Sequence, residues 1–311
     1  MCLHDPSFSH IDCLFSCSHW TFDDRTPSQV IQCFVAKIEE SCKELIDRGI
    51  EESSTSYGQD ETEAWTVWGK EEECDSLLIW LHGGYWQVPS SVALSLSTLR
   101  KFVVPSPSPP LLQEGSRSCA SPIVLPLLSQ GVLVVSLGYN LASPTRSILH
   151  IIRDIVPAVQ KLLDRYPTKG RVVIGGHSAG AQLAFKVASS LSSPRITGLA
   201  LFSGVFQLQD IVDTVVGRPI NLTTEDAVRC SCSADELDSG EVEVLLVVGD
   251  YDSPVLRSQS VEMYQGLKRR AIKAQLKEMA GEDHFSLIQG LSDPSNDQTK
   301  SLLQFTSNQA L

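Results

Sequence analysis

Short apolar runs alternate along this chain with longer stretches in which apolar residues recur every three or four positions. The short runs are typical of buried strands, and the periodic stretches are typical of helices with one buried face. Strands that alternate with helices at this rhythm predict a mostly parallel sheet with helices on both faces. The predicted strands are 76–81, 131–136, 172–174, 196–202, 242–248 and 274–279.

The first 75 residues predict an arm, a helix and a hairpin. Residues 1–25 have no period, and we expect them to lie on the domain as an N-terminal arm. Thr26-Pro-Ser-Gln29 is a capping box with proline at the first helical position, which predicts a helix as far as Gly49. Ser53–Tyr57 and Ala64–Trp68 favour two strands of a hairpin at the sheet edge.

Two irregular stretches interrupt the alternation of strands and helices. Residues 101–122 are rich in proline and serine, which predicts a mobile surface insertion without a fold of its own. Residues 204–240 separate two predicted strands, and an excursion of that length is expected to lie over a functional site as a cap. Between these stretches, Ser143 and Pro144 are expected to open a helix. We interpret residues 1–311 as a single α/β domain that carries these insertions.

Composition and charge exclude several classes of protein. The chain has 311 residues, 42% of them hydrophobic, and a formal net charge of -12. It therefore lacks the clusters of lysine and arginine that nucleic-acid binding requires. No apolar run is long enough to predict a membrane span, and the first residues lack the features of a secretory signal. We expect a cytoplasmic protein, with the nucleus as a second location.

The nine cysteines have no regular spacing, and we expect them to be reduced thiols. Cys230-Ser-Cys232 lacks the two-residue spacing of a zinc site and has no second pair of ligands at a suitable distance. Metalloprotease, phosphate-loop and dinucleotide-binding motifs are also absent from the sequence. No metal and no cofactor is expected.

One serine lies where a strand should turn sharply into a helix. Gly176-His-Ser-Ala-Gly180 follows the apolar strand that ends at Ile174 and precedes a helix rich in small residues. This Gly-x-Ser-x-Gly motif in this context predicts that Ser178 is a nucleophile on a strained turn that lifts its hydroxyl above the sheet edge. The amide of Ala179, at the start of the helix, would then be free to bind a developing negative charge.

A second glycine turn follows the strand 76–81. His82-Gly-Gly-Tyr-Trp86 contains two consecutive glycines, which let backbone amides face a ligand. If Ser178 is the nucleophile, the amides of Gly83, Gly84 and Tyr85 are the natural remaining oxyanion donors. The alternative is an ordinary turn in which the glycines only reverse the chain.

Chain order selects the remaining members of a catalytic triad. In the α/β-hydrolase arrangement the serine comes first, then the acid, then the histidine. Of the seven histidines, only His284 follows both the serine and a candidate acid. Asp252 is favoured over Asp250 as the acid because it lies beyond the end of its strand. Asp283 is expected to be a surface charge, because neighbours in an extended chain point apart. The predicted reaction is acyl transfer to water through an ester of Ser178.

Several stretches between about residues 76 and 290 together resemble the kynurenine formamidase (arylformamidase) family of α/β hydrolases. The resemblance implies the α/β-hydrolase fold and hydrolysis of N-formyl-L-kynurenine to L-kynurenine and formate by Ser178, Asp252 and His284. The stretches are His82–Gln87, Gly176–Ala181, Leu201–Phe206, Leu222–Ala227, Val247–Pro254 and Asp283–Phe285.

Some functional alternatives stay open at this point. His82, Tyr85 and Trp86 could contact the aromatic substrate, or the aromatic pair could serve only in packing. A general carboxylesterase with the same triad is the nearest alternative activity, and a catalytically inactive hydrolase fold that acts as a receptor is a second. The expected partner is a small-molecule substrate, and neither nucleic acid nor a membrane. The sequence leaves a monomer and a homodimer open.

Overall fold

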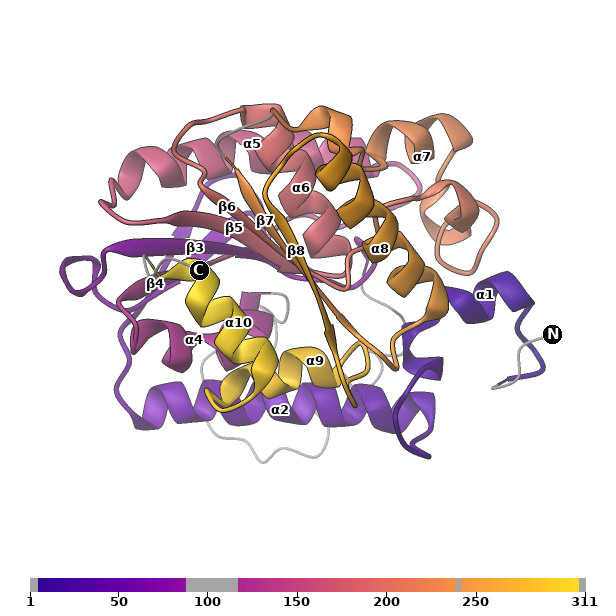
Figure 1. The fold of residues 1–311 in the computed structure, drawn as a ribbon, viewed down its shortest axis with the longest axis horizontal. Coiled ribbons are helices and arrows are strands. Elements are labelled where there is room, and N and C mark those ends of the chain that lie inside the picture. The colour runs from indigo at the N-terminus through magenta and orange to yellow at the C-terminus, as the bar shows by residue number, and fades with distance from the viewer. Residues whose placement is uncertain (1–4, 88–116, 239–241, 308–311) are drawn as a thin grey trace.

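The structure is a computed structural model that describes residues 5–87, 117–238 and 242–307. A single eight-stranded sheet runs through these residues in the order β1-β2-β4-β3-β5-β6-β7-β8 (Figure 1). The pairs β1/β2 and β2/β4 are antiparallel, and every other pair is parallel. The strands are β1 (Glu52–Ser56), β2 (Ala64–Trp68), β3 (Ser76–Leu81), β4 (Val132–Leu137), β5 (Val172–His177), β6 (Gly198–Phe202), β7 (Glu243–Gly249) and β8 (Ala274–Met279).

Helices cover both faces of the sheet, which confirms the predicted fold class. In Figure 1, α5, α6 and α8 lie above the sheet, and α2, α4, α9 and α10 lie below it. The helices are α1 (His10–Leu14), α2 (Pro27–Asp47), α4 (Ser121–Leu128), α5 (Ile148–Arg165), α6 (Ala179–Leu191), α7 (Thr224–Cys230), α8 (Pro254–Arg269), α9 (Ser286–Gln289) and α10 (Asp297–Thr306).

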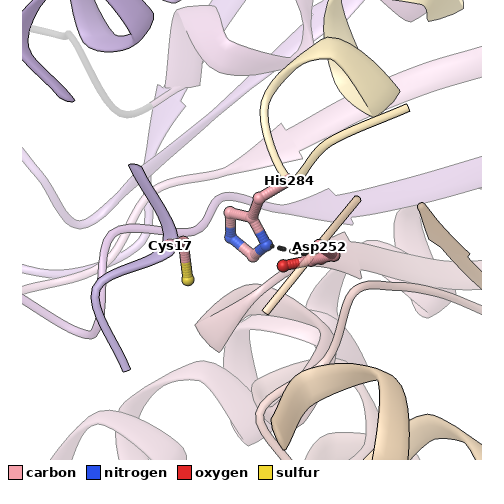
Figure 2. A group of neighbouring side chains, drawn as sticks. All are labelled: Cys17, Asp252 and His284. Carbon is pink, nitrogen blue, oxygen red and sulfur yellow. Dashed lines mark hydrogen bonds and ion pairs between the residues drawn. The ribbon is translucent and has the colours of Figure 1, made fainter. Parts of the chain in front are cut away.

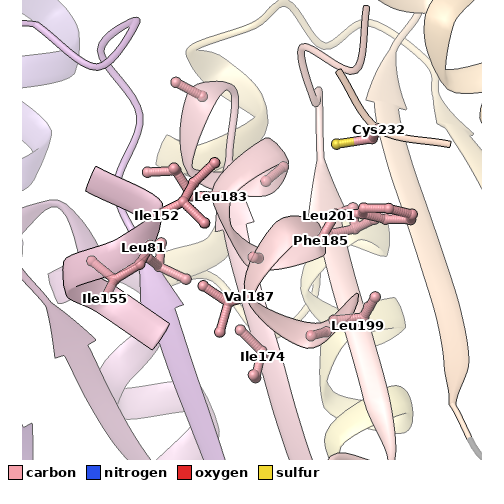
Figure 3. Close-up of a cluster of buried hydrophobic side chains, with 14 of the residues drawn as sticks. Leu81, Ile152, Ile155, Ile174, Leu183, Phe185, Val187, Leu199, Leu201 and Cys232 are labelled. Carbon is pink, nitrogen blue, oxygen red and sulfur yellow. The ribbon is translucent and has the colours of Figure 1, made fainter. Parts of the chain in front are cut away.

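The sheet divides the apolar core into two clusters. Along β3, Leu77, Ile79 and Leu81 belong to the cluster on one face, and Leu78 and Trp80 belong to the other. This alternation follows from the two-residue period of a strand. Figure 3 shows part of the first cluster, where side chains of α5 and α6 pack on β3, β5 and β6. Both faces of β3 are therefore buried, as its continuous apolar run predicts.

Local signals placed most elements correctly, and one helix start was wrong. Thr26 caps α2 in a reciprocal capping box with Gln29, and β1 and β2 form the predicted antiparallel hairpin at the sheet edge. However, α5 does not begin at Ser143 and Pro144. It begins at Ile148, because Ser147 and His150 form the capping box.

The two irregular stretches differ in how far the structure describes them. Residues 101–116 of the proline- and serine-rich stretch lie outside the described residues. Its remaining part is folded: Arg117–Ala120 form a 3-10 helix that leads directly into α4. The stretch 204–240 contains α7 and buries several apolar side chains in the first core cluster. In Figure 1, α7 and the N-terminal α1 lie toward the same end of the sheet.

The cysteines are mostly, but not all, free thiols. Cys13 is disulfide-bonded, so the expectation of reduced cysteines was wrong for this residue. Seven other cysteines within the described ranges are free. No helix in this part of the chain is long and apolar enough to cross a membrane.

Candidate active site

Ser178 occupies a strained turn between β5 and α6. Its backbone has φ 58° and ψ -122°, a conformation that residues with a side chain rarely adopt. The flanking glycines permit the turn: a Cβ atom on Gly180 would lie 2.1 Å from the carbonyl oxygen of Leu81, and one on Gly176 would lie 2.5 Å from the Gly180 backbone. The sharp strand-to-helix turn predicted from Gly-x-Ser-x-Gly is therefore present.

The glycine turn after β3 lies directly beside this serine. A Cβ atom on Gly83 would lie 3.1 Å from Ser178 Cβ, so the two backbones approach closely. Gly84 and Tyr85 both have positive φ, at 103° and 51°. Within the described residues, the amides of Gly83, Gly84, Tyr85 and Ala179 donate no hydrogen bond. These four amides are thus free to bind an oxyanion formed next to Ser178.

Asp252 and His284 form a buried hydrogen-bonded pair. His284 Nδ1 lies 2.9 Å from Asp252 Oδ2, and both side chains are almost completely buried (Figure 2). Asp252 Oδ1 also accepts a hydrogen bond of 2.6 Å from the amide of Ser253, at the start of α8. The rejected alternative, Asp250, instead accepts a bond from the amide of Gly281. The structure therefore brings together His284, which chain order selected, and Asp252, which was favoured for its place beyond the end of the strand.

The charge environment of His284 favours its protonated form. Burial opposes a charge on the ring, but the Asp252 carboxylate and the Cys17 sulfur outweigh it and raise the pKa of His284 well above its usual value. The neighbouring ring of His177 behaves in the opposite way. Burial and the nearby His284 lower the pKa of His177 well below its usual value, so this ring stays neutral. Of the two imidazoles, only that of His284 is therefore suited to hold an added proton.

His177 connects the turn of Ser178 to the loop that carries His284. Its ring lies 4.4 Å from the His284 ring, centroid to centroid, and its Nε2 donates a 3.0 Å hydrogen bond to the His284 carbonyl. Because His177 precedes Ser178 in the chain, this contact holds the base loop next to the nucleophile. The Ser178 hydroxyl itself makes no hydrogen bond to any described residue. In free enzymes the contact between nucleophile and base often tightens only when substrate binds.

The N-terminal arm brings Cys17 into the site, which no sequence pattern indicated. Figure 2 shows its thiol beside the His284 ring and Asp252. The Cys17 sulfur also lies 3.4 Å from the hydroxyl of Tyr85, which donates a 2.8 Å hydrogen bond to the carbonyl of Phe15. An aperiodic arm offers no sequence signal for these contacts. The residues that it approaches are 68 or more positions away.

Asp283 is not a surface charge, and this prediction was wrong. Its side chain is fully buried and lies 3.1 Å from Arg25 of the arm. It also accepts hydrogen bonds from the hydroxyl of Thr21 and the amides of Phe285 and Ser286. The chain turns at this point, so the carboxylate points inward and fixes the loop that carries His284. The rule for extended neighbours fails because the loop is not extended.

The residues proposed for substrate contact differ in their surroundings. The Trp86 ring is fully buried in the core, and its Nε1 donates a 2.8 Å hydrogen bond to Gln182 of α6, which favours the packing alternative. His82 is buried and stacks on Tyr139 with ring centroids 4.1 Å apart. Burial lowers the pKa of His82 to about 4, so this ring is neutral at physiological pH. Tyr85 is only partly buried, and its hydroxyl lies 3.4 Å from the Cys17 sulfur.

Comparison with known proteins agrees with this geometry. A sequence profile of the alpha/beta hydrolase fold matches residues 128–287. The kynurenine formamidase of Danio rerio is 31% identical over 237 residues, which cover 73% of this chain and 72% of the relative. The chain belongs to the kynurenine formamidase family.

A second member of the kynurenine formamidase family matches almost the whole chain. The protein of this name from Salmo salar is 29% identical over 96% of this chain and 97% of its own length. A solved structure from Silicibacter sp. has the same fold, with a TM-score of 0.67 and 21% identity over 89% of this chain and 92% of the other. The chain is a hydrolase of this family, and its fold extends over nearly all of its length.

Proposed function

We propose that this protein hydrolyses N-formyl-L-kynurenine to L-kynurenine and formate, with Ser178 as nucleophile. Membership of the kynurenine formamidase family supports the substrate. A formyl carbonyl is unhindered, and an aryl amine leaves more readily than an alkyl amine. A serine triad with an oxyanion site can therefore cleave this amide.

The proposed reaction proceeds in two acyl-transfer steps. His284 accepts the hydroxyl proton of Ser178 while the serine oxygen attacks the formyl carbon. The free amides of Gly83, Gly84, Tyr85 and Ala179 bind the oxyanion that forms, and the proton on His284 passes to the departing aryl amine. Water then attacks the formyl ester by the same route in reverse, which releases formate and restores Ser178.

The observation that carries this proposal is the buried pair of Asp252 and His284 beside the strained turn of Ser178. The carboxylate holds the imidazole in one orientation and stabilises its charged form during each proton transfer. The two side chains are in direct contact, through a hydrogen bond of 2.9 Å between His284 Nδ1 and Asp252 Oδ2. A general acid or base without such a partner would contribute less.

An assay with purified protein and N-formyl-L-kynurenine tests the proposal. We expect release of free aryl amine and formate, and a fall in kcat of at least about 10³-fold in Ser178→Ala. The matched control is Ser190→Ala, an exposed serine on the same helix, which should keep full activity. Aryl acetates assayed in parallel separate a formamidase from a general carboxylesterase, because the latter would turn over the esters and leave the formamide intact. Unchanged activity in Ser178→Ala would refute the mechanism.

A further inference from the structure

Three side chains of the types that ligate metals lie close together in the candidate active site. A sulfur of Cys17, a carboxylate oxygen of Asp252 and a ring nitrogen of His284 all lie within 4.8 Å of one another. All three residues are buried. Figure 2 shows that they come from distant parts of the chain: the N-terminal arm, the loop after β7 and the loop after β8. Among the described residues, no other group of three such side chains is as close.

We propose that Cys17, Asp252 and His284 form a binding site for a borderline-soft divalent cation such as Zn²⁺. Thiolate, imidazole and carboxylate are the three ligand types that zinc takes in proteins, and a water molecule would complete a tetrahedron. At usual zinc–ligand lengths, the ligand atoms of a tetrahedral site are roughly 3.3–3.8 Å apart. Side-chain adjustments of about an ångström bring the observed cluster into this range.

The ligand set also selects which cations bind. A thiolate is a poor ligand for Mg²⁺ and Ca²⁺, which require oxygen donors, and a good one for Zn²⁺ and Co²⁺. Cys17 is buried in the first core cluster, and a buried site disfavours a hard cation that retains several waters. Binding releases the thiol proton of Cys17 to solvent. It also releases the proton between His284 and Asp252 if the metal takes Nδ1.

Occupation of this site removes the base of the proposed triad. A metal-bound His284 cannot take the proton of Ser178, and Asp252 no longer stabilises an imidazolium. The cation is therefore an inhibitor and not a cofactor. The inhibition rests on the proposed function, whereas the binding itself rests only on the three side chains. The two can therefore be tested separately.

Cobalt binding tests the site without any use of activity. Titration of the full-length protein with Co²⁺ should produce the near-ultraviolet absorption of a cobalt–thiolate bond, and this absorption should be lost in Cys17→Ser. The matched control is Cys33→Ser, which removes an exposed thiol of α2 and should leave the absorption unchanged. If the absorption fails to appear in the wild-type protein, or persists in Cys17→Ser, the site does not exist.

Zinc inhibition tests the consequence for hydrolysis. On the plateau of the pH–rate profile, Zn²⁺ should inhibit the wild-type protein and Cys33→Ser alike, and Mg²⁺ should not inhibit. Cys17→Ser should need at least about tenfold more Zn²⁺ for half-inhibition, measured relative to its own rate without metal, since even outer partners of a metal contribute that much. Equal zinc sensitivity in Cys17→Ser would overturn the proposal.

A second variant and a second readout guard against misfolding of Cys17→Ser. A buried thiol packs like a small apolar group, so Cys17→Ala is the alternative substitution. A cation that binds only the folded state raises Tm, and Zn²⁺ should do so for the wild-type protein but not for either variant. An equal rise in Tm for all three proteins would contradict the site. If the wild-type protein shows no hydrolysis of N-formyl-L-kynurenine even without metal, this result would count against the proposed function alone.

Discussion

At the scale of single residues, the site depends on which of two adjacent imidazoles is protonated. His177 and His284 lie with ring centroids 4.4 Å apart, and protonation of either ring disfavours protonation of the other. Asp252 removes the ambiguity because, of the two rings, its carboxylate is hydrogen-bonded to that of His284. The hydrogen bond from His177 to the His284 carbonyl keeps the neutral ring in a structural role. The arrangement thus defines which ring accepts a proton and which ring positions it.

A pH–rate profile of kcat/KM should show the protonation of His284. His284 must be neutral to accept the proton of Ser178, so the rate should fall as the pH drops below the raised pKa of His284. In Asp252→Asn the carboxylate that raises this pKa is lost and burial still lowers it. The inflection should therefore move to lower pH, and the plateau rate should fall by about 10²–10⁴-fold. An inflection at the same pH in both proteins would mean that Asp252 does not set the charge of His284.

At the scale of elements, local sequence patterns located a strand or a helix start correctly wherever only one such pattern was present. Continuous apolar runs located β3 and β7, and the capping box at Thr26 located the start of α2. The start of α5 was misplaced because Ser143-Pro144 is a helix-start pattern as well. In the structure Ser143 pairs with Arg146 across an isolated bridge, so the chain can begin the helix only after that turn.

The loop that carries His284 is held by the N-terminal arm. Arg25 lies just before α2, and its guanidinium contacts both the buried Asp283 and the ring of Phe22. This ion pair links residues 258 positions apart in sequence. No local pattern could predict it, because the sequence shows neither which loop is buried nor which cation reaches it. The arm is therefore packed against the loop of the candidate active site.

Arg25→Gln should destabilise the protein and lower its activity. Asp283 would stay buried without its cation, and because Arg25 is only about one-fifth exposed, we expect a loss on the order of 2 kcal/mol in the free energy of unfolding. Urea denaturation measures this loss. The control is Arg48→Gln, which breaks an exposed pair with Glu44 and should cost less than about 0.5 kcal/mol. Equal midpoints for the two variants would show that the ion pair with Asp283 contributes nothing.

At the scale of the whole molecule, long-range contacts were predictable only where a rule connected the residues. The pairing of Asp252 with His284 was predictable because a rule of chain order places an acid and then a histidine after the serine of the Gly-x-Ser-x-Gly motif. Cys17 and His177 were not, since their roles arise only when the arm and the turn after β5 meet the base loop. Contacts of this kind come from tertiary packing, in which each apolar element is buried against whichever surface completes the core.

Substitution of Phe15 tests whether the N-terminal arm unfolds together with the rest of the protein. The Phe15 side chain is fully buried in the same cluster as Trp86, next to the Cys17 that reaches His284. Phe15→Ala should therefore lower the free energy of unfolding by about 3–5 kcal/mol. The control is Phe22→Ala, a 44% exposed aromatic of the same arm, which should cost about 1 kcal/mol or less.

The same variant tests whether the arm unfolds together with the sheet. If they form one unit, tryptophan fluorescence and hydrolytic activity should be lost at the same urea concentration, and both midpoints should move together in Phe15→Ala. The five tryptophans of the chain include Trp80 in the sheet core and Trp20 in the arm. A peripheral arm would behave differently: activity would vanish first, while most of the fluorescence change would remain at the wild-type midpoint. Coincident transitions would establish that the residues around the base, including those from the arm, are held by the stability of the whole fold.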